Sequence, residues 1–116
     1  MKEKLIKTLE PLGYEIYEQG SFTDTSKYPD NFFTFWNYET EGHGFYDNSE
    51  NAIIWHFDLN FYSIDPFKPL EVIRKAKELL KANGFICIGL GMDLATDTLT
   101  HVARNINISI IERKEQ

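Results

Sequence analysis

The stretch Ala52–Ser63, AIIWHFDLNFYS, most constrains what this chain can fold into, because large apolar residues recur in it at every second position. The apolar positions are Ile53, Trp55, Phe57, Leu59 and Phe61, and the positions between them include His56, Asp58, Asn60 and Tyr62. Successive residues of a β-strand point to opposite faces of a sheet. The stretch therefore predicts a strand with one face in the core and one face open to water.

A second strand is predicted just before this one. Phe32–Glu39 is rich in aromatic residues and threonine, which favour strands over helices. The residues Glu41–Asn51, EGHGFYDNSEN, follow it. Two strands joined by a glycine-containing surface loop most simply pair antiparallel, so we expect a long hairpin with EGHGFYDNSEN at its tip. The glycines on either side of His43 would let the tip adopt positive φ angles.

Three further segments complete the predicted sheet. Tyr14–Glu18 alternates Tyr, Ile and Glu positions, which predicts a short strand. Residues 85–94, FICIGLGMDL, predict another. In residues 101–114 apolar side chains alternate with small or polar ones, which predicts the last strand. Gly89-Leu90-Gly91 lacks the third glycine and the Lys-Ser/Thr pair of a phosphate-binding loop. A bulge or tight contact within a strand explains these two glycines better.

Two helices are predicted from amphipathic spacing. The first is Lys2–Glu10, which stops near Pro11. The second runs from Pro66 to Asn83, with Asp65 as its N-cap and Pro66 in its first turn. Its expected buried stripe consists of Leu70, Ile73, Ala76, Leu79 and Leu80.

The order of the predicted elements is helix, three strands, helix and two strands. This order predicts an α+β fold, with a four- to five-stranded, mostly antiparallel sheet and both helices packed on one face. A length of 116 residues suits one compact domain, so we expect residues 1–116 to form a single domain.

Charge and cysteine content narrow the function classes. Twelve basic and eighteen acidic side chains leave a formal charge of −6, and no long Lys/Arg run or basic stripe appears before the short Arg113-Lys114 tail. Binding through nucleic-acid phosphates is therefore a poor hypothesis. Cys87 is the only cysteine, which excludes an internal disulfide and a thiolate metal cluster. The N-terminus resembles no secretion signal, and no run is long enough to span a bilayer.

No catalytic or cofactor-binding constellation emerges from the residues. His43 has no second histidine at a metal-binding spacing, so we expect no metal there. His56 and Asp58 share a strand face and could form an acid/base pair, but no nucleophile with a recognisable elbow accompanies them. They are better explained as polar residues on the outer face of a sheet. His101 is expected to satisfy a turn, and Cys87 to lie in the core.

The surplus of aromatic residues points to an interface. Phe32, Phe33, Phe35, Trp36 and Tyr38 cannot all face one core, because neighbouring strand residues alternate. We therefore expect Trp36 or Tyr38 to lie near the surface, beside the loop that carries Phe45 and Tyr46. Exposed aromatic surface of this kind is typical of subunit interfaces. The complete set of candidate interface residues is Trp36, Tyr38, His43, Phe45, Tyr46, Asp47, Asn48 and Glu50.

The region from about residue 30 to residue 112 resembles small tail proteins of long-tailed phages and prophages of Gram-positive bacteria, and more narrowly tail terminator, or tail-completion, proteins. The resemblance rests on Phe45-Tyr46-Asp47-Asn48, Trp55, Asn60-Phe61-Tyr62-Ser63, the Asp65-Pro66 helix start, Asp97 and Thr100-His101. Residues before 30 match nothing in that pattern.

The resemblance implies a structural protein that is not an enzyme and uses no cofactor. It implies a ring of identical subunits, a hexamer, that caps the tail tube and contacts both the tail-tube protein and the head–tail connector. DNA would pass through its lumen without specific binding, and no membrane would be involved. The protein would assemble in the cytoplasm of the bacterial host and end in the virion tail.

Three alternatives stay open at the level of sequence. A head–tail connector or another minor tail component would fit the same resemblance. A small acidic binding module, such as an immunity-type inhibitor of a toxic enzyme, would also expose acidic and aromatic residues. An enzyme would need a constellation drawn from His43, Asp47, His56, Asp58 and His101.

Overall fold

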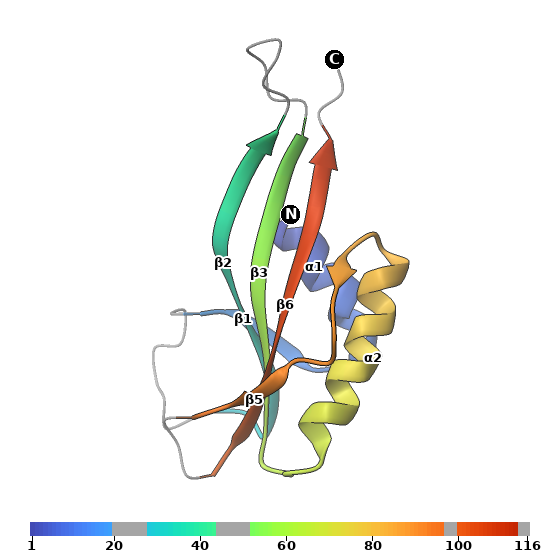
Figure 1. The fold of residues 1–116 in the computed structure, drawn as a ribbon. Helices are drawn as coiled ribbons and strands as arrows, with labels where there is room; N and C mark the ends of the chain where they lie inside the picture. Colours follow the sequence, from blue (N-terminus) through green and yellow to red (C-terminus); the bar gives the residue numbers. More distant parts are fainter. Residues whose placement is uncertain (20–27, 44–51, 97–99, 114–116) are drawn as a thin grey trace.

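The chain folds as one mixed β-sheet with two helices (Figure 1). The computed structural model describes residues 1–19, 28–43, 52–96 and 100–113. The elements in chain order are α1 (Lys2–Leu9), the 3-10 turn η1 (Glu10–Leu12), β1 (Glu15–Glu18), β2 (Asn31–His43), β3 (Ala52–Ser63), α2 (Lys68–Ala82), β4 (Ile86–Cys87), β5 (Met92–Leu94) and β6 (Val102–Arg113).

The sheet has six strands in the order β1-β2-β3-β6-β4, and β5 pairs with β6 as well. β2, β3 and β6 form its long antiparallel centre, and β1 lies parallel to β2 at one edge. The α+β class and the two helices are as expected, but the predicted four to five strands and their order are wrong in detail. β1 and β2 are parallel, and strands paired in this way need a connection longer than a two-residue hairpin turn, which the separation of Glu18 from Asn31 along the chain allows.

The core lies between the helices and one face of the sheet. The predicted inward set of β3 is confirmed at Phe57, Leu59 and Phe61, which are fully buried. Ile106, Ile108 and Ile110 of β6 extend this face, and Leu5, Leu9 and Ile73 cover it from the helices. Trp55 packs only partly against the core, and its Nε1 donates a hydrogen bond to Glu112.

The second helix differs from the prediction at its start. Asp65 accepts a hydrogen bond from the backbone N–H of Phe67 and so stabilises a turn before α2, and the helix begins only at Lys68. The proline of the first turn is therefore Pro69 rather than Pro66. The buried stripe also differs from the prediction, because Val72 is buried while Leu70 is 36% exposed and Leu79 is only partly buried. The predicted end is correct, because Gly84 follows α2 with a φ of 90°.

The predicted single strand at residues 85–94 is wrong. It is divided into β4 and β5 by residues 88–91, in which Gly89 and Gly91 have φ angles of 72° and 78°. A backbone with positive φ leaves the extended conformation, so the strand ends there. The predicted tight contact is confirmed at Gly91, because a Cβ built there would lie 1.9 Å from the backbone oxygen of Asn105.

The hairpin of β2 and β3 is confirmed as antiparallel, but it is longer than predicted. β2 continues to His43, which pairs with Ala52, so Glu41, Gly42 and His43 are strand residues and not part of a tip. Figure 1 shows β2, β3 and β6 extending past the helices at the end where this hairpin closes. Residues 44–51 lie outside the described part of the chain.

Candidate functional site: the helix-free face of the sheet

The face of β2, β3 and β6 that the helices leave uncovered has three zones. The first is an aromatic cluster around Phe32, which is only 2% exposed although it points away from the main core. Its ring stacks on Tyr62 with the centroids 4.8 Å apart, and it also contacts Tyr28 and His101. This end of the face is therefore a second, small core.

His101 connects that cluster to the segment before β2 through a hydrogen bond to Pro29. Its Nε2 lies 2.8 Å from the backbone oxygen of Pro29, and a carbonyl oxygen only accepts, so Nε2 carries the proton. Nδ1 then accepts from the hydroxyl of Thr100 at 2.9 Å. Both ring nitrogens are engaged, so the expected structural role of His101 is confirmed and extended from a turn to a long-range contact.

The second zone is a ladder of polar side chains across the three strands. The amide of Asn105 donates to Asn60, and the amide of Asn60 donates to Thr34. Asn60 and Thr34 are buried, so these hydrogen bonds satisfy polar groups that would otherwise be costly to remove from water.

The third zone contains the exposed aromatic residues. Trp36 is 48% exposed and Tyr38 is 45% exposed, so the prediction that at least one of these rings lies near the surface is confirmed for both. The pairing of β2 with β3 is interrupted between Asn37 and Glu39, so that Tyr38 is an extra residue in a β-bulge. Its ring lies beside that of His56, with the centroids 5.8 Å apart.

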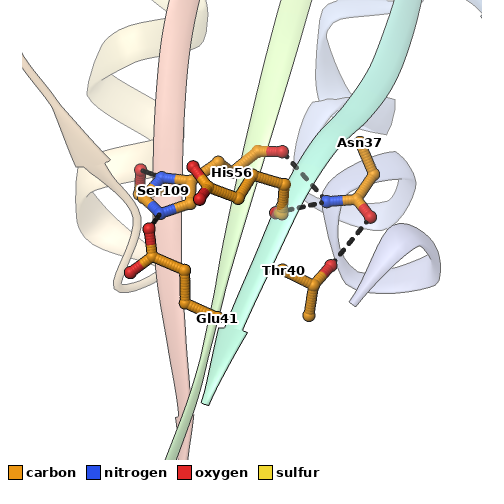
Figure 2. A network of polar contacts seen from close by, with 6 residues as sticks. Asn37, Thr40, Glu41, His56 and Ser109 are labelled. Atoms are coloured by element: carbon orange, nitrogen blue, oxygen red, sulfur yellow. Dashed lines mark hydrogen bonds and ion pairs between the residues drawn. The ribbon is translucent and has the colours of Figure 1, made fainter. Parts of the chain in front are cut away.

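The side chain of Asn37 holds the bulge in place (Figure 2). Its Nδ2 donates to the backbone oxygens of Glu39 and His56, at 3.0 and 2.9 Å. Its Oδ1 accepts from the hydroxyl of Thr40 at 2.9 Å. The hydrogen bond to His56 links β2 to β3 at the point where the bulge interrupts their pairing.

The bulge has a chemical consequence because it shifts the alternation of β2. If β2 had no bulge, Tyr38 would pair with His56. The side chains of Glu39 and Glu41 would then point to the helix side of the sheet. In the observed register Glu39 pairs with His56 and Glu41 pairs with Ile54, so both carboxylates join His56 on the helix-free face. One donor atom from each of Glu39, Glu41 and His56 lies within 4.8 Å of the others.

The local field on this part of the face is negative. Tyr38 shows it, because partial burial raises the pKa of its phenol, and the charges of Asp58, Glu39 and Glu41 raise that pKa further. A phenol near several carboxylates keeps its proton more strongly because its ionised form would be repelled.

The predicted candidates meet different outcomes. Trp36 and Tyr38 lie together on the helix-free face, and His43 is the last residue of β2. Phe45, Tyr46, Asp47, Asn48 and Glu50 lie outside the described residues. His56 and Asp58 do share a face, as expected from their spacing, but the residues nearest His56 are Ser109, Tyr38 and Glu41.

Sequence reasoning missed Glu39 and Glu41 as partners of His56, although one signal was present. In an unbroken strand both glutamates share the face of Phe33 and Phe35, and charged side chains at such positions indicate a register shift.

No family model matches the chain, and no curated protein matches it. In the described residues, neither helix has the length and apolar character needed to cross a lipid bilayer.

Proposed function

We propose that this protein is a structural assembly subunit of the tail-terminator class that its sequence resembles, and that its helix-free face binds a neighbouring copy of the chain in a ring. The observation that supports the proposal is the exposure of Trp36 and Tyr38 on a sheet face that no helix of the described chain covers. Half-exposed Trp and Tyr residues supply large contact areas with few rotatable bonds, which favours them at interfaces.

The size of the face limits what it can bind alone. β2, β3 and β6 contain 13, 12 and 12 residues. Strands of that length are roughly 40 Å long and about 4.8 Å apart, so the three together present on the order of 600 Å². A standard interface needs roughly 800 Å² from each partner. The connection between β2 and β3, with Phe45 and Tyr46, is therefore proposed to contribute the remainder.

The aromatic residues can be tested in the phage or prophage that encodes the chain. We expect the double variant Trp36→Ser, Tyr38→Ser to give overlong tail tubes without heads, because subunits that cannot join their neighbours do not cap the tube. Tail length in electron micrographs and infectious titre measure this. Phe67→Ser is the matched control, because Phe67 is 86% exposed but precedes α2 rather than lying on the proposed face.

Normal tails and full titre in a folded double variant would refute the proposed interface. Normal-length tails that lack heads would indicate instead the head–tail connector function.

A second class of function is favoured by the carboxylates of Glu39, Glu41 and Asp58 beside these aromatic rings, because such a surface suits a basic partner, as in an immunity-type inhibitor. Inhibition of a toxic enzyme encoded by a neighbouring gene, together with normal tails, would establish that alternative.

A further inference from the structure

The group formed by Glu39, Glu41 and His56 has the donor set of a metal site and lies at an irregularity of the sheet. Its donors are one imidazole and two carboxylates, which converge from two neighbouring strands. Its position depends on a bulge, and bulges are often found where a strand re-aims side chains at a functional site. The bulge is itself held by three side-chain hydrogen bonds of Asn37, so the convergence is built into the sheet.

His56 is oriented as a metal-binding histidine would be. Its Nδ1 lies 2.7 Å from the hydroxyl oxygen of Ser109 on β6 (Figure 2). If Nδ1 donates to that oxygen, the proton is on Nδ1 and the lone pair is on Nε2. A hydrogen bond of this kind to the second ring nitrogen fixes the tautomer and orientation of metal-binding histidines.

The other ring nitrogen of His56 has no hydrogen bond within the described chain. Nε2 is buried, although the side chain as a whole is 20% exposed. Oε1 of Glu41 lies 3.3 Å from Nε2, and this contact meets the distance for an ion pair but not the geometry of a hydrogen bond. A buried polar atom without a hydrogen bond is uncommon and needs an explanation.

We propose that Glu39, Glu41 and His56 bind a divalent first-row transition-metal ion of the zinc class. One nitrogen and two oxygen donors suit such an ion better than Mg²⁺ or Ca²⁺, which prefer oxygen donors alone. Three protein ligands leave a further position for water or for a donor from another molecule. The metal proposal does not rest on the proposed assembly function, because all three ligands belong to one chain, although they lie beside Tyr38 on the same helix-free face.

The distances require only a small closure of the site. Donor atoms around a tetrahedral Zn²⁺ lie roughly 3.4 Å apart, because each is about 2.1 Å from the metal. The three donors here lie within 4.8 Å of one another, and Glu39 is exposed and free to change its rotamer. The two carboxylates also place negative charge at the site, which favours a bound cation.

The simpler interpretation is that Glu41 and a protonated His56 form an ion pair and nothing binds there. The two interpretations differ in a titration of the purified full-length chain with ZnCl₂ after chelator treatment. We expect calorimetry to show one Zn²⁺ per chain, and Mg²⁺ to give no comparable heat. We also expect Zn²⁺ to raise the midpoint of thermal unfolding, because it binds only the folded arrangement.

Variants then assign the ligands. His56→Gln and Glu39→Gln should each weaken Zn²⁺ binding by at least about tenfold, since loss of even an outer-shell partner costs about 10- to 100-fold. Co²⁺ added to the wild-type chain should show visible absorption bands that both variants lose. Glu71→Gln is the matched control, because Glu71 lies on α2 and its side chain is 65% exposed. His43→Gln tests the histidine that follows Glu41 by two residues in the sequence, and both controls should keep wild-type affinity.

Thermal unfolding without metal establishes that each variant is folded, and Glu39→Gln is the safer variant because the residue is exposed. The proposal is overturned if the wild-type chain binds no Zn²⁺. It is also overturned if folded Glu39→Gln and His56→Gln bind Zn²⁺ as tightly as the wild type, or if His43→Gln alone abolishes binding.

Discussion

Phe57 and Tyr38 are aromatic residues on neighbouring strands with opposite environments. Phe57 lies on the helix side of β3 and is fully buried, and its ring packs against Trp55 and Phe35. Tyr38 lies at the bulge of β2 on the helix-free face and is 45% exposed. The difference comes from strand alternation and from the bulge, since both residues are large and aromatic.

Truncation of these two side chains should therefore have unequal effects on stability. We expect Phe57→Ala to lower the free energy of unfolding by about 3–5 kcal/mol, because it removes buried apolar surface and leaves a cavity. Tyr38→Ala should cost no more than about 1 kcal/mol, as is usual for a residue near the surface. Chemical denaturation of the isolated chain measures both. Equal losses would show that Tyr38 belongs to the core and would remove it as an interface residue.

At the scale of elements, the break between β4 and β5 shows how local backbone geometry limits a strand. Gly89 and Gly91 both have positive φ, but only Gly91 approaches β6 closely. Arg104 of β6 stabilises this contact, because its guanidinium donates hydrogen bonds to the backbone oxygens of Leu90 and Gly91. The segment is therefore held against β6 even though it is not a continuous strand.

The two glycines provide a matched pair for testing that packing. Gly89→Ala should cost about 1–2 kcal/mol, because an L-residue is strained at positive φ and a Cβ there meets no neighbouring atom within 4 Å. Gly91→Ala should cost about 2–5 kcal/mol, because the Cβ would also collide with the backbone of Asn105. Denaturant unfolding of the two variants tests this order. A loss at Gly91 no larger than at Gly89 would contradict the close approach to β6.

At the scale of the whole molecule, burial in the shared core changes the pKa of Cys87, the one cysteine in the sequence. Cys87 is buried in β4 among residues of the helices and the sheet. Burial raises the pKa of its thiol above the ordinary value of 9.0, and the charges of Lys77 and Lys81 oppose that shift in part. The unfolded chain therefore loses this proton at a lower pH than the folded chain does.

This linkage predicts the sign of a pH effect on global stability. The contribution of Cys87 is fully present below the ordinary thiol pKa and is lost as the pH rises through the raised pKa of the folded state. We expect the free energy of unfolding to fall between about pH 8 and about pH 10, and to fall less steeply in Cys87→Ala. Parallel slopes in the two proteins would contradict the raised pKa.

Periodicity alone was enough to predict the main elements and most of the core. Alternation in Ala52–Ser63 identified β3 and its buried residues, because side-chain direction in a strand follows directly from residue parity. The same reasoning placed α1 and α2, and it predicted that Trp36 or Tyr38 would be exposed. These features depend on spacing within one segment, which a sequence displays completely.

Contacts between segments were decided only by the tertiary structure. The parallel pairing of β1, the second core around Phe32 and the meeting of Glu39 and Glu41 with His56 all depend on how distant segments approach one another. The bulge at Tyr38 is the clearest case. One unpaired residue, held by Asn37, moves two carboxylates to the opposite face of the sheet. Parity within β2 signals that a shift exists, but it does not locate the shift, because the register is set by pairing with β3.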